Sequence, residues 1–265
     1  MAPIAEEISF IPLNSESWIN GNQLPQNFPL FRSKNGEYNF PDTINIFGVL
    51  GMSLKTFDKR EGANNIYQPH RIEVYIDEKL HHSLQFDRLD YDWLNTANFI
   101  KDYRNARLNL GDFVKLYHNE TDPNVPIHSD STNGVLDLTP GYHDIKIHIM
   151  DHLMNLRIVR GTILNMEPFD ITLKPLGETK DLISFLIQSK NISIPIKSVL
   201  AYSFTPYGYA DERVSIQSSE SIKEGNIITL LKKQTDRRAL QFIAENKLGT
   251  LSRPFHWVDS QSYHD

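Results

Sequence analysis

The chain has 265 residues, no cysteine and a formal net charge of −6 at pH 7. The lack of cysteine excludes disulfide bonds, thiol catalysis and cysteine-ligated zinc, and the acidic balance argues against a nucleic-acid-binding surface, which needs a basic stripe. Apolar residues make up 40% of the chain and aromatic residues 11%, which is enough for a hydrophobic core.

The N-terminus, MAPIAEEISF, carries acidic residues where a signal peptide has a basic region followed by an apolar run. No later stretch approaches the roughly 20 apolar residues of a membrane-spanning helix. We therefore expect either a cytosolic protein or an internal piece of a longer exported one. The strand-like segment at the very start favours the second interpretation.

Alternation of apolar and polar residues dominates the first 165 positions, which is typical of strands with one buried face. The strand-like runs are 8–13, 43–57, 70–76, 80–86, 113–117, 134–138, 142–151 and 156–163. The run 77–79 separates two of them and predicts a hairpin. Gly48 and Gly51 interrupt the run 43–57 and indicate a bulge or a bend.

The segment 92–109 breaks this pattern, because Ala97, Ile100 and Arg104 follow one another at helical spacing. With Asp92 as its N-cap, it predicts a helix inserted between strands. The segment 118–134 has the composition of a loop.

A second set of strand-like runs follows Glu167 and Pro168, at 169–173, 182–188, 196–204, 213–218, 227–231 and 239–245. Residues 224–226 predict a hairpin turn. Short strands at this spacing are typical of β-sandwiches. The fold prediction is all-β, with two immunoglobulin-like β-sandwich domains: 1–165, with a helical insertion near 90–110, and a smaller one at 166–265.

The segment 141–163 raises the question of a metal site. On a helix, the H-x-x-x-H spacing of His148 and His152 would place both imidazoles on one face, beside Asp151. However, the alternating isoleucines 145, 147 and 149 favour a strand. A strand sends His143 and His148 to opposite faces and leaves His152 in the turn. No metal site is therefore predicted, and a metal-dependent hydrolase using His148, Asp151 and His152 stays as an alternative hypothesis.

Three further groups are weaker candidates for a site. His118 and Asp122 have a metal-ligand spacing but lie in the loop. Asp58, Gly62 and Asn64 belong to an acidic, Asn-rich segment whose oxygen atoms could suit calcium, although its spacing is not that of an EF-hand and a turn is favoured. Exposed aromatic side chains bind sugars, so Tyr207 and Tyr209 are candidate ligand-binding residues. No catalytic motif is present in the sequence, so we predict a binding role and not an enzyme.

Several segments of residues 1–165 resemble the region that follows the catalytic domain in secreted bacterial zinc metallopeptidases of the LytM/lysostaphin type, common in Bacteroidetes and relatives. The matching features keep their order: the strand start 41–44, the loop with Asp58, Gly62 and Asn64, the hairpin 70–80, the pair Asp102 and Tyr103, the run 133–138, and a strand closed by Asp151 and Asn155. Met154 stands where the family usually has glycine, so a wider turn is expected. For residues 166–265 the resemblance is weak.

This resemblance implies an immunoglobulin-like accessory region of a peptidoglycan-directed zinc endopeptidase, without its catalytic domain. Zinc would belong to the parent peptidase, because the family's H-x-H motif does not occur here. No cofactor and no catalytic residue is predicted for this chain. The implied partners are the chain's own peptidase domain or cell-wall material, in the periplasm or outside the cell. A stand-alone glycan- or protein-binding module of the cell envelope is the alternative.

Overall fold

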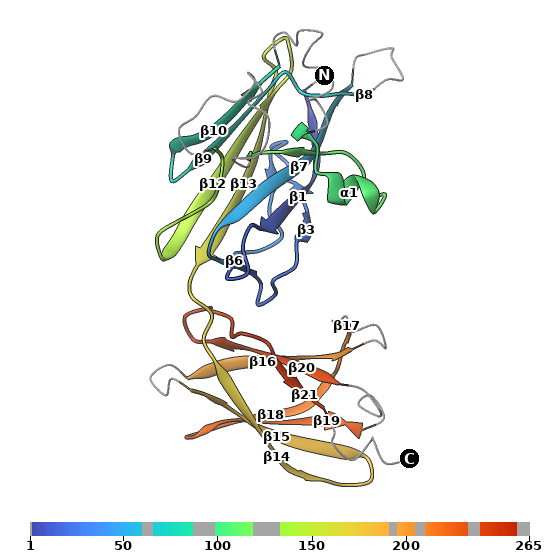
Figure 1. Cartoon of the computed structure of the whole chain (residues 1–265), viewed down its shortest axis with the longest axis vertical. Helices are drawn as coiled ribbons and strands as arrows, with labels where there is room; N and C mark the ends of the chain where they lie inside the picture. The colour runs from blue at the N-terminus through green and yellow to red at the C-terminus, as the bar shows by residue number, and fades with distance from the viewer. Residues whose placement is uncertain are drawn as a thin grey trace. The chain divides into compact units, whose positions relative to one another are not determined.

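The structure, a computed structural model, describes residues 2–59, 66–86, 99–118, 133–190, 195–204, 210–232 and 239–258. These residues form strands and one short helix, in two compact units (Figure 1). One unit comprises Met1–Ile19 with Gln23–Met166, and the other comprises Asn20–Asn22 with Glu167–Asp265. The predicted all-β fold is confirmed. Among the residues described, no helix is long and apolar enough to cross a bilayer.

The first unit contains a five-stranded antiparallel sheet with the strand order β11-β7-β1-β3, and β8 pairs with β7. Its strands are β1 (Ile4–Pro12), β3 (Gln26–Pro29), β7 (Leu50–Lys59), β8 (Ile66–Tyr67) and β11 (Phe113–Lys115). Alternation along β7 points Met52 and Leu54 into the core, whereas Ser53 and Lys55 bind partners on the other face.

The second sheet of this unit has eight strands. Six follow the order β10-β9-β12-β13-β5-β4, β6 also pairs with β13, and β2 pairs with β6. Its strands are β2 (Trp18–Ile19), β4 (Phe31–Arg32), β5 (Tyr38–Asn39), β6 (Ile44–Phe47), β9 (Arg71–Ile76), β10 (Lys79–Gln85), β12 (Gly141–Met150) and β13 (Leu156–Asn165). β5 and β6 both pair with β13 in parallel, one after the other along its length.

One hydrophobic core joins the two sheets of the first unit. The isoleucines 145, 147 and 149 of β12 are at most 1% exposed and face this core, as the alternation predicts. The ring of Phe10 packs edge-to-face against Phe28 and Phe40, with both centroid distances 6.1 Å. The layout is therefore a β-sandwich.

Some predicted elements of this unit differ in the structure. The run 43–57 is divided at Gly48, whose φ is +80°, so that β6 and β7 belong to different sheets. Gly51 is not a bulge, because it pairs in register with Ile11. The run 134–138 is not a strand. It forms one bridge, in which Leu136 exchanges two backbone hydrogen bonds with Leu50.

The helix of the inserted segment begins at a different place from the predicted one. α1 (Tyr103–Arg107) begins after the N-cap Asp102, not after Asp92. The predicted N-cap and most of the predicted first turns fall in residues 87–98, outside the described residues. Within the described residues, the prediction of a helical insertion is confirmed at Tyr103–Arg107.

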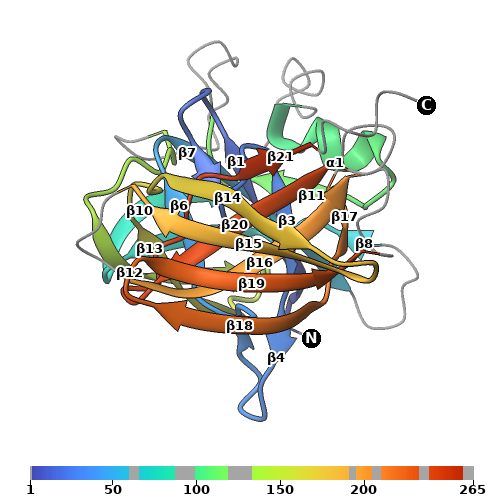
Figure 2. The same cartoon turned by 90° about the horizontal axis from the view of Figure 1, so that it is seen from below.

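The second unit contains two four-stranded sheets. The order β14-β15-β19-β18 is visible as four strands lying side by side in Figure 2, and the other sheet has the order β17-β16-β20-β21. The strands are β14 (Ile171–Glu178), β15 (Leu182–Ser189), β16 (Ile196–Phe204), β17 (Ala210–Arg213), β18 (Ile216–Ile222), β19 (Gly225–Leu231), β20 (Leu240–Asn246) and β21 (Phe255–Trp257). The ring of Phe185 lies 5.2 Å from Phe242 and 5.0 Å from Trp257, so both sheets contribute to one core.

Here too the sequence missed some boundaries. The predicted run 213–218 is shared between β17 and β18, which belong to different sheets. The first strand extends to Glu178, and β21 was not predicted at all. The turn between β18 and β19 consists of Lys223 and Glu224, one residue earlier than predicted, because Ile222 pairs with Gly225.

Candidate functional site

A cavity of about 370 Å³ lies beside the inserted helix of the first unit. Its walls are formed by Phe99, Lys101, Asp102, Tyr103, Lys115 and Tyr117. We call it the α1 cavity. Its volume falls in the range of about 300–1,000 Å³ that is typical of small-molecule sites.

The segment before α1 reaches this position by following the edge strand β11. The Asp102 N–H donates to the Phe113 carbonyl at 2.9 Å, and Lys101 forms a bridge with Val114. Ile100 is 7% exposed and belongs to the core, which anchors the segment. Its two neighbours, Phe99 and Lys101, line the cavity instead.

The carboxylate of Asp102 ties α1 to the five-stranded sheet. It accepts hydrogen bonds from Ser53 Oγ at 2.9 Å, from Asn105 Nδ2 at 2.8 Å and from the Asn105 backbone N–H at 3.2 Å. Asn105 is fully buried, and its side-chain oxygen accepts from Asn27 Nδ2 at 2.9 Å. Because Ser53 is on β7 and Asn27 is on β3, this network holds the helix across the outer face of the sheet.

Tyr117 forms a fixed wall of the cavity. A Cβ at Gly51 would lie 2.5 Å from the Tyr117 ring, so only glycine leaves room for the ring against β7. The Lys115 amine lies 4.9 Å from the centroid of the same ring, within reach of a cation–π interaction. This explains Gly51, which the sequence marked only as an interruption.

Two further side chains of the cavity are aromatic and accessible. Tyr103 is 74% exposed and Phe99 is 46% exposed. Lys101 Nζ lies 2.7 Å from Asp112 Oδ2 in a surface ion pair. The cavity therefore combines two exposed aromatic side chains with the amine of Lys101.

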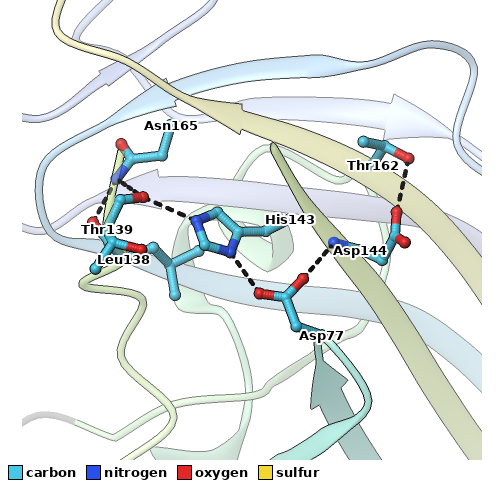
Figure 3. A network of polar contacts seen from close by, with 7 residues as sticks. All are labelled: Asp77, Leu138, Thr139, His143, Asp144, Thr162 and Asn165. Carbon is cyan, nitrogen blue, oxygen red and sulfur yellow. Dashed lines mark hydrogen bonds and ion pairs between the residues drawn. The ribbon is translucent and has the colours of Figure 1, made fainter. Parts of the chain in front are cut away.

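His143, the first histidine of the segment 141–163, belongs to a structural network on the other sheet (Figure 3). Its Nδ1 lies 2.6 Å from Asp77 Oδ2, and its Nε2 lies 2.8 Å from the Thr139 carbonyl. Asp77 Oδ1 accepts from the Asp144 N–H at 2.9 Å. Asn165 Nδ2 donates to the carbonyl oxygens of residues 138 and 139.

His143 and Asp77 each favour the charged form of the other. Burial of the imidazole opposes its protonation, but the hydrogen bonds to Asp77 and Thr139 outweigh it, so the pKa of His143 is raised. The hydrogen bond from His143, together with the Asp144 N–H, lowers the pKa of Asp77. The result is an ion pair that fastens the β9–β10 turn to β12.

His148 lies on the opposite face of β12 from His143, as the strand interpretation requires. Its ring centroid is 4.9 Å from that of Tyr75, and its Nδ1 is 3.7 Å from Glu73 Oε2. Burial lowers the pKa of His148, and Lys146 adds to this, against the attraction of Glu73. His148 is thus part of a packed cluster on the sheet surface.

Asp151 and Asn155 close the β12–β13 turn. Asp151 Oδ1 accepts from the N–H groups of Leu153 and Asn155, each at 2.8 Å, and its Oδ2 accepts from Asn155 Nδ2 at 2.7 Å. Although burial opposes ionisation, these hydrogen bonds lower the pKa of Asp151. His152 is exposed in the same turn.

The expectation of a wider turn at Met154 is wrong. Met154 adopts the left-handed conformation, with φ +63°, and its N–H donates to the Asp151 carbonyl at 3.0 Å. Methionine therefore occupies the conformation that glycine would adopt more easily.

The remaining sequence candidates are only partly described. Asp58 is buried at the end of β7, whereas Gly62 and Asn64 lie outside the described residues. His118 is described, but Asp122 is not, and Tyr207 and Tyr209 also lie outside the described part of the chain. Among the described residues, no three His, Asp or Glu side chains are grouped so that they could hold a metal ion.

The sequence did not reveal the α1 cavity. Phe99 and Tyr103 fall in the segment 92–109, which the sequence predicts as a helix, and nothing in that pattern marks a cavity. Lys115 and Tyr117 come from a separate strand region, so their place in the same cavity as Tyr103 depends on the pairing of β11 with β7.

Comparisons with known proteins identify no family for this chain. No protein-family model matches it, and no curated protein matches at a significant level. Among solved structures, the fibronectin(III)-like modules of CbhA from Clostridium thermocellum align over 81% of this chain and 87% of theirs, with 9% identity and a TM-score of 0.35. Dimeric latent PorU from Porphyromonas gingivalis aligns over 97% of this chain and 20% of its own, with 11% identity and a TM-score of 0.25. At these scores neither resemblance bears on function.

Proposed function

We propose that the chain is a non-catalytic accessory region of a cell-wall-directed zinc metalloendopeptidase, located in the cell envelope, and that it binds peptidoglycan or positions the peptidase. The observation that carries the binding role is the α1 cavity, where the exposed side chains of Phe99 and Tyr103 lie at the start of a helix held by a buried polar network. The link to a peptidase comes from the sequence resemblance of residues 1–165.

The residues that carry this resemblance have structural roles, which supports a non-catalytic function. Asp151 and Asn155 close a hairpin turn, and Asp102 caps the inserted helix. All three use their side chains in hydrogen bonds within the sandwich. The shared residues thus maintain a fold, which is what an accessory region requires.

The proposal is tested by sedimentation of the purified chain with insoluble peptidoglycan, with cellulose and an unrelated β-sandwich protein as controls. We expect the chain to pellet with peptidoglycan and to release no soluble fragments from it, with or without added zinc. Failure to pellet contradicts the binding role. Release of fragments by the chain alone contradicts the non-catalytic role.

A stand-alone glycan- or protein-binding module of the envelope is the second candidate, and the α1 cavity favours it equally. The two candidates differ in what the gene encodes before Met1. A zinc peptidase domain in the same reading frame supports the accessory role, whereas a native start at Met1 supports the stand-alone module.

A further inference from the structure

We propose that the α1 cavity binds one pyranose ring of a glycan, stacked on Tyr103. The inference rests on the binding role proposed above and deepens it, because it names the ligand class and the residues that hold the ligand. Nothing in the resemblance of the sequence assigns a ligand to this cavity.

The aromatic side of the cavity is the first argument. Two exposed aromatic side chains that line one cavity offer a ligand a contiguous apolar surface. The face of an aromatic ring carries partial negative charge. A pyranose ring presents C–H groups with partial positive charge on one face, so Tyr103 and Phe99 offer it a stacking surface.

The rim of the cavity is the second argument. The exposed hydroxyl of Tyr103 and the Lys101 amine, which pairs with Asp112, are hydrogen-bond donors beside the aromatic surface. A pyranose ring carries hydroxyl groups around its edge, which can accept from such donors. An apolar peptide side chain in the same place would separate the Tyr103 hydroxyl and the Lys101 amine from water without offering them hydrogen bonds, at an energetic cost. A sugar therefore fits the cavity better than an apolar peptide.

The fixed geometry is the third argument. Tyr103 is the first residue of α1, directly after Asp102, whose carboxylate is held by Ser53 and Asn105. Tyr117, on the other wall, is seated against Gly51. A platform that is ordered before binding loses little conformational entropy when the ligand arrives.

The test is isothermal titration of the whole chain with two soluble probes, the β-1,4-linked hexamer of N-acetylglucosamine and cellohexaose. The variants are Tyr103→Ala, Tyr103→Phe and, as a matched control, Tyr142→Ala. Tyr142 is 64% exposed on β12, in the other sheet of the same unit. Because both tyrosines are exposed, all three variants are expected to keep the melting temperature of the wild type.

For at least one probe, we expect Tyr103→Ala to weaken binding by about tenfold or more, while Tyr103→Phe keeps most of the affinity. Tyr142→Ala is expected to bind like the wild type. The proposal is overturned if neither probe binds. It is also overturned if Tyr103→Ala binds as tightly as the wild type.

The outcomes separate this inference from the proposed function. If Tyr103→Ala still pellets with peptidoglycan and the probes do not bind, the inference fails and the wall-binding role stands. If the chain does not pellet with peptidoglycan but binds cellohexaose through Tyr103, the inference stands and the wall-binding role fails.

Discussion

His143 and Asp77 are 66 residues apart in the sequence, yet the imidazole Nδ1 lies 2.6 Å from the carboxylate Oδ2. The side chain of His143 is 10% exposed and that of Asp77 is 49% exposed. The imidazole is therefore nearly buried, and the carboxylate contacts it from the β9–β10 turn. Asp77 has φ +48°, a conformation that aspartate and asparagine tolerate better than most residues. The pair joins a turn, a strand and a carbonyl group of the preceding segment.

This pair predicts a pH-dependent stability difference between the wild type and Asp77→Asn. The raised pKa of His143 adds stability that is complete below about pH 6.5 and is lost as the pH rises through that raised pKa. The lowered pKa of Asp77 adds stability that is present above about pH 4 and is lost on acidification. Urea unfolding should therefore show a difference of about 1 kcal/mol between pH 4 and 6.5 that shrinks outside this window.

Asparagine suits position 77 because it keeps the turn conformation and can still accept from the Asp144 N–H. Asp144→Asn is the control, since its exposed carboxylate contacts Thr162 and not His143. The explanation fails if the two variants have the same pH profile.

Gly161→Ala is predicted to destabilise the first unit. A Cβ at this position would lie 1.9 Å from the ring of Phe40, which packs against Phe10 in the core. Overpacking of this kind costs about 2–3 kcal/mol. Calorimetry should show a clear fall in the melting temperature. The control is Gly177→Ala in the second unit, where a Cβ meets nothing within 4 Å. Equal melting temperatures for the two variants would contradict the steric argument.

Met154→Gly is predicted to stabilise the chain. The left-handed conformation costs methionine at φ +63° about 1–2 kcal/mol of stability. Glycine adopts it freely and loses only about 0.5–1 kcal/mol, through the greater entropy of its unfolded state. The net gain should be about 0.5 kcal/mol. Leu153→Gly changes a neighbour that is also exposed but has no positive φ, and it should destabilise the chain. Urea titration of both variants measures the difference, and a loss of stability in Met154→Gly would refute the prediction.

Local pattern explains what the sequence predicted and what it did not. The alternation of Ile145, Ile147 and Ile149 is sufficient to predict a strand and to place His143 and His148 on opposite faces. The partners of these histidines are not predictable in this way, because Asp77 and Tyr75 reach them through the pairing of β9 with β12. The same limit applies to the α1 cavity, where residues between Phe99 and Tyr103 meet Lys115 and Tyr117.

Zinc is predicted to have no effect on the stability of the chain. Both oxygens of Asp151 accept hydrogen bonds within the turn, and His148 packs between Tyr75 and Glu73. Binding of a metal would require these contacts to break. The melting temperature should be the same with EDTA and with equimolar zinc, and elemental analysis should find no stoichiometric metal. Stoichiometric zinc that disappears in His148→Ala would instead establish the metal-dependent alternative.

Asp102→Ala is predicted to release α1 from the sheet and to impair the cavity. The change removes an N-cap, at about 1 kcal/mol, and leaves the buried donors of Ser53 and Asn105 without their acceptor, so the total loss should be about 2–3 kcal/mol. Hydrogen exchange should show faster exchange at residues 103–110, with little change in β12. The control is Asp112→Ala, since among the described residues Asp112 forms a surface ion pair with Lys101, worth at most about 1 kcal/mol. Because Tyr103 follows Asp102 directly, glycan binding should weaken in Asp102→Ala and persist in Asp112→Ala. Unchanged exchange at residues 103–110 in Asp102→Ala would show that the helix is held by other contacts.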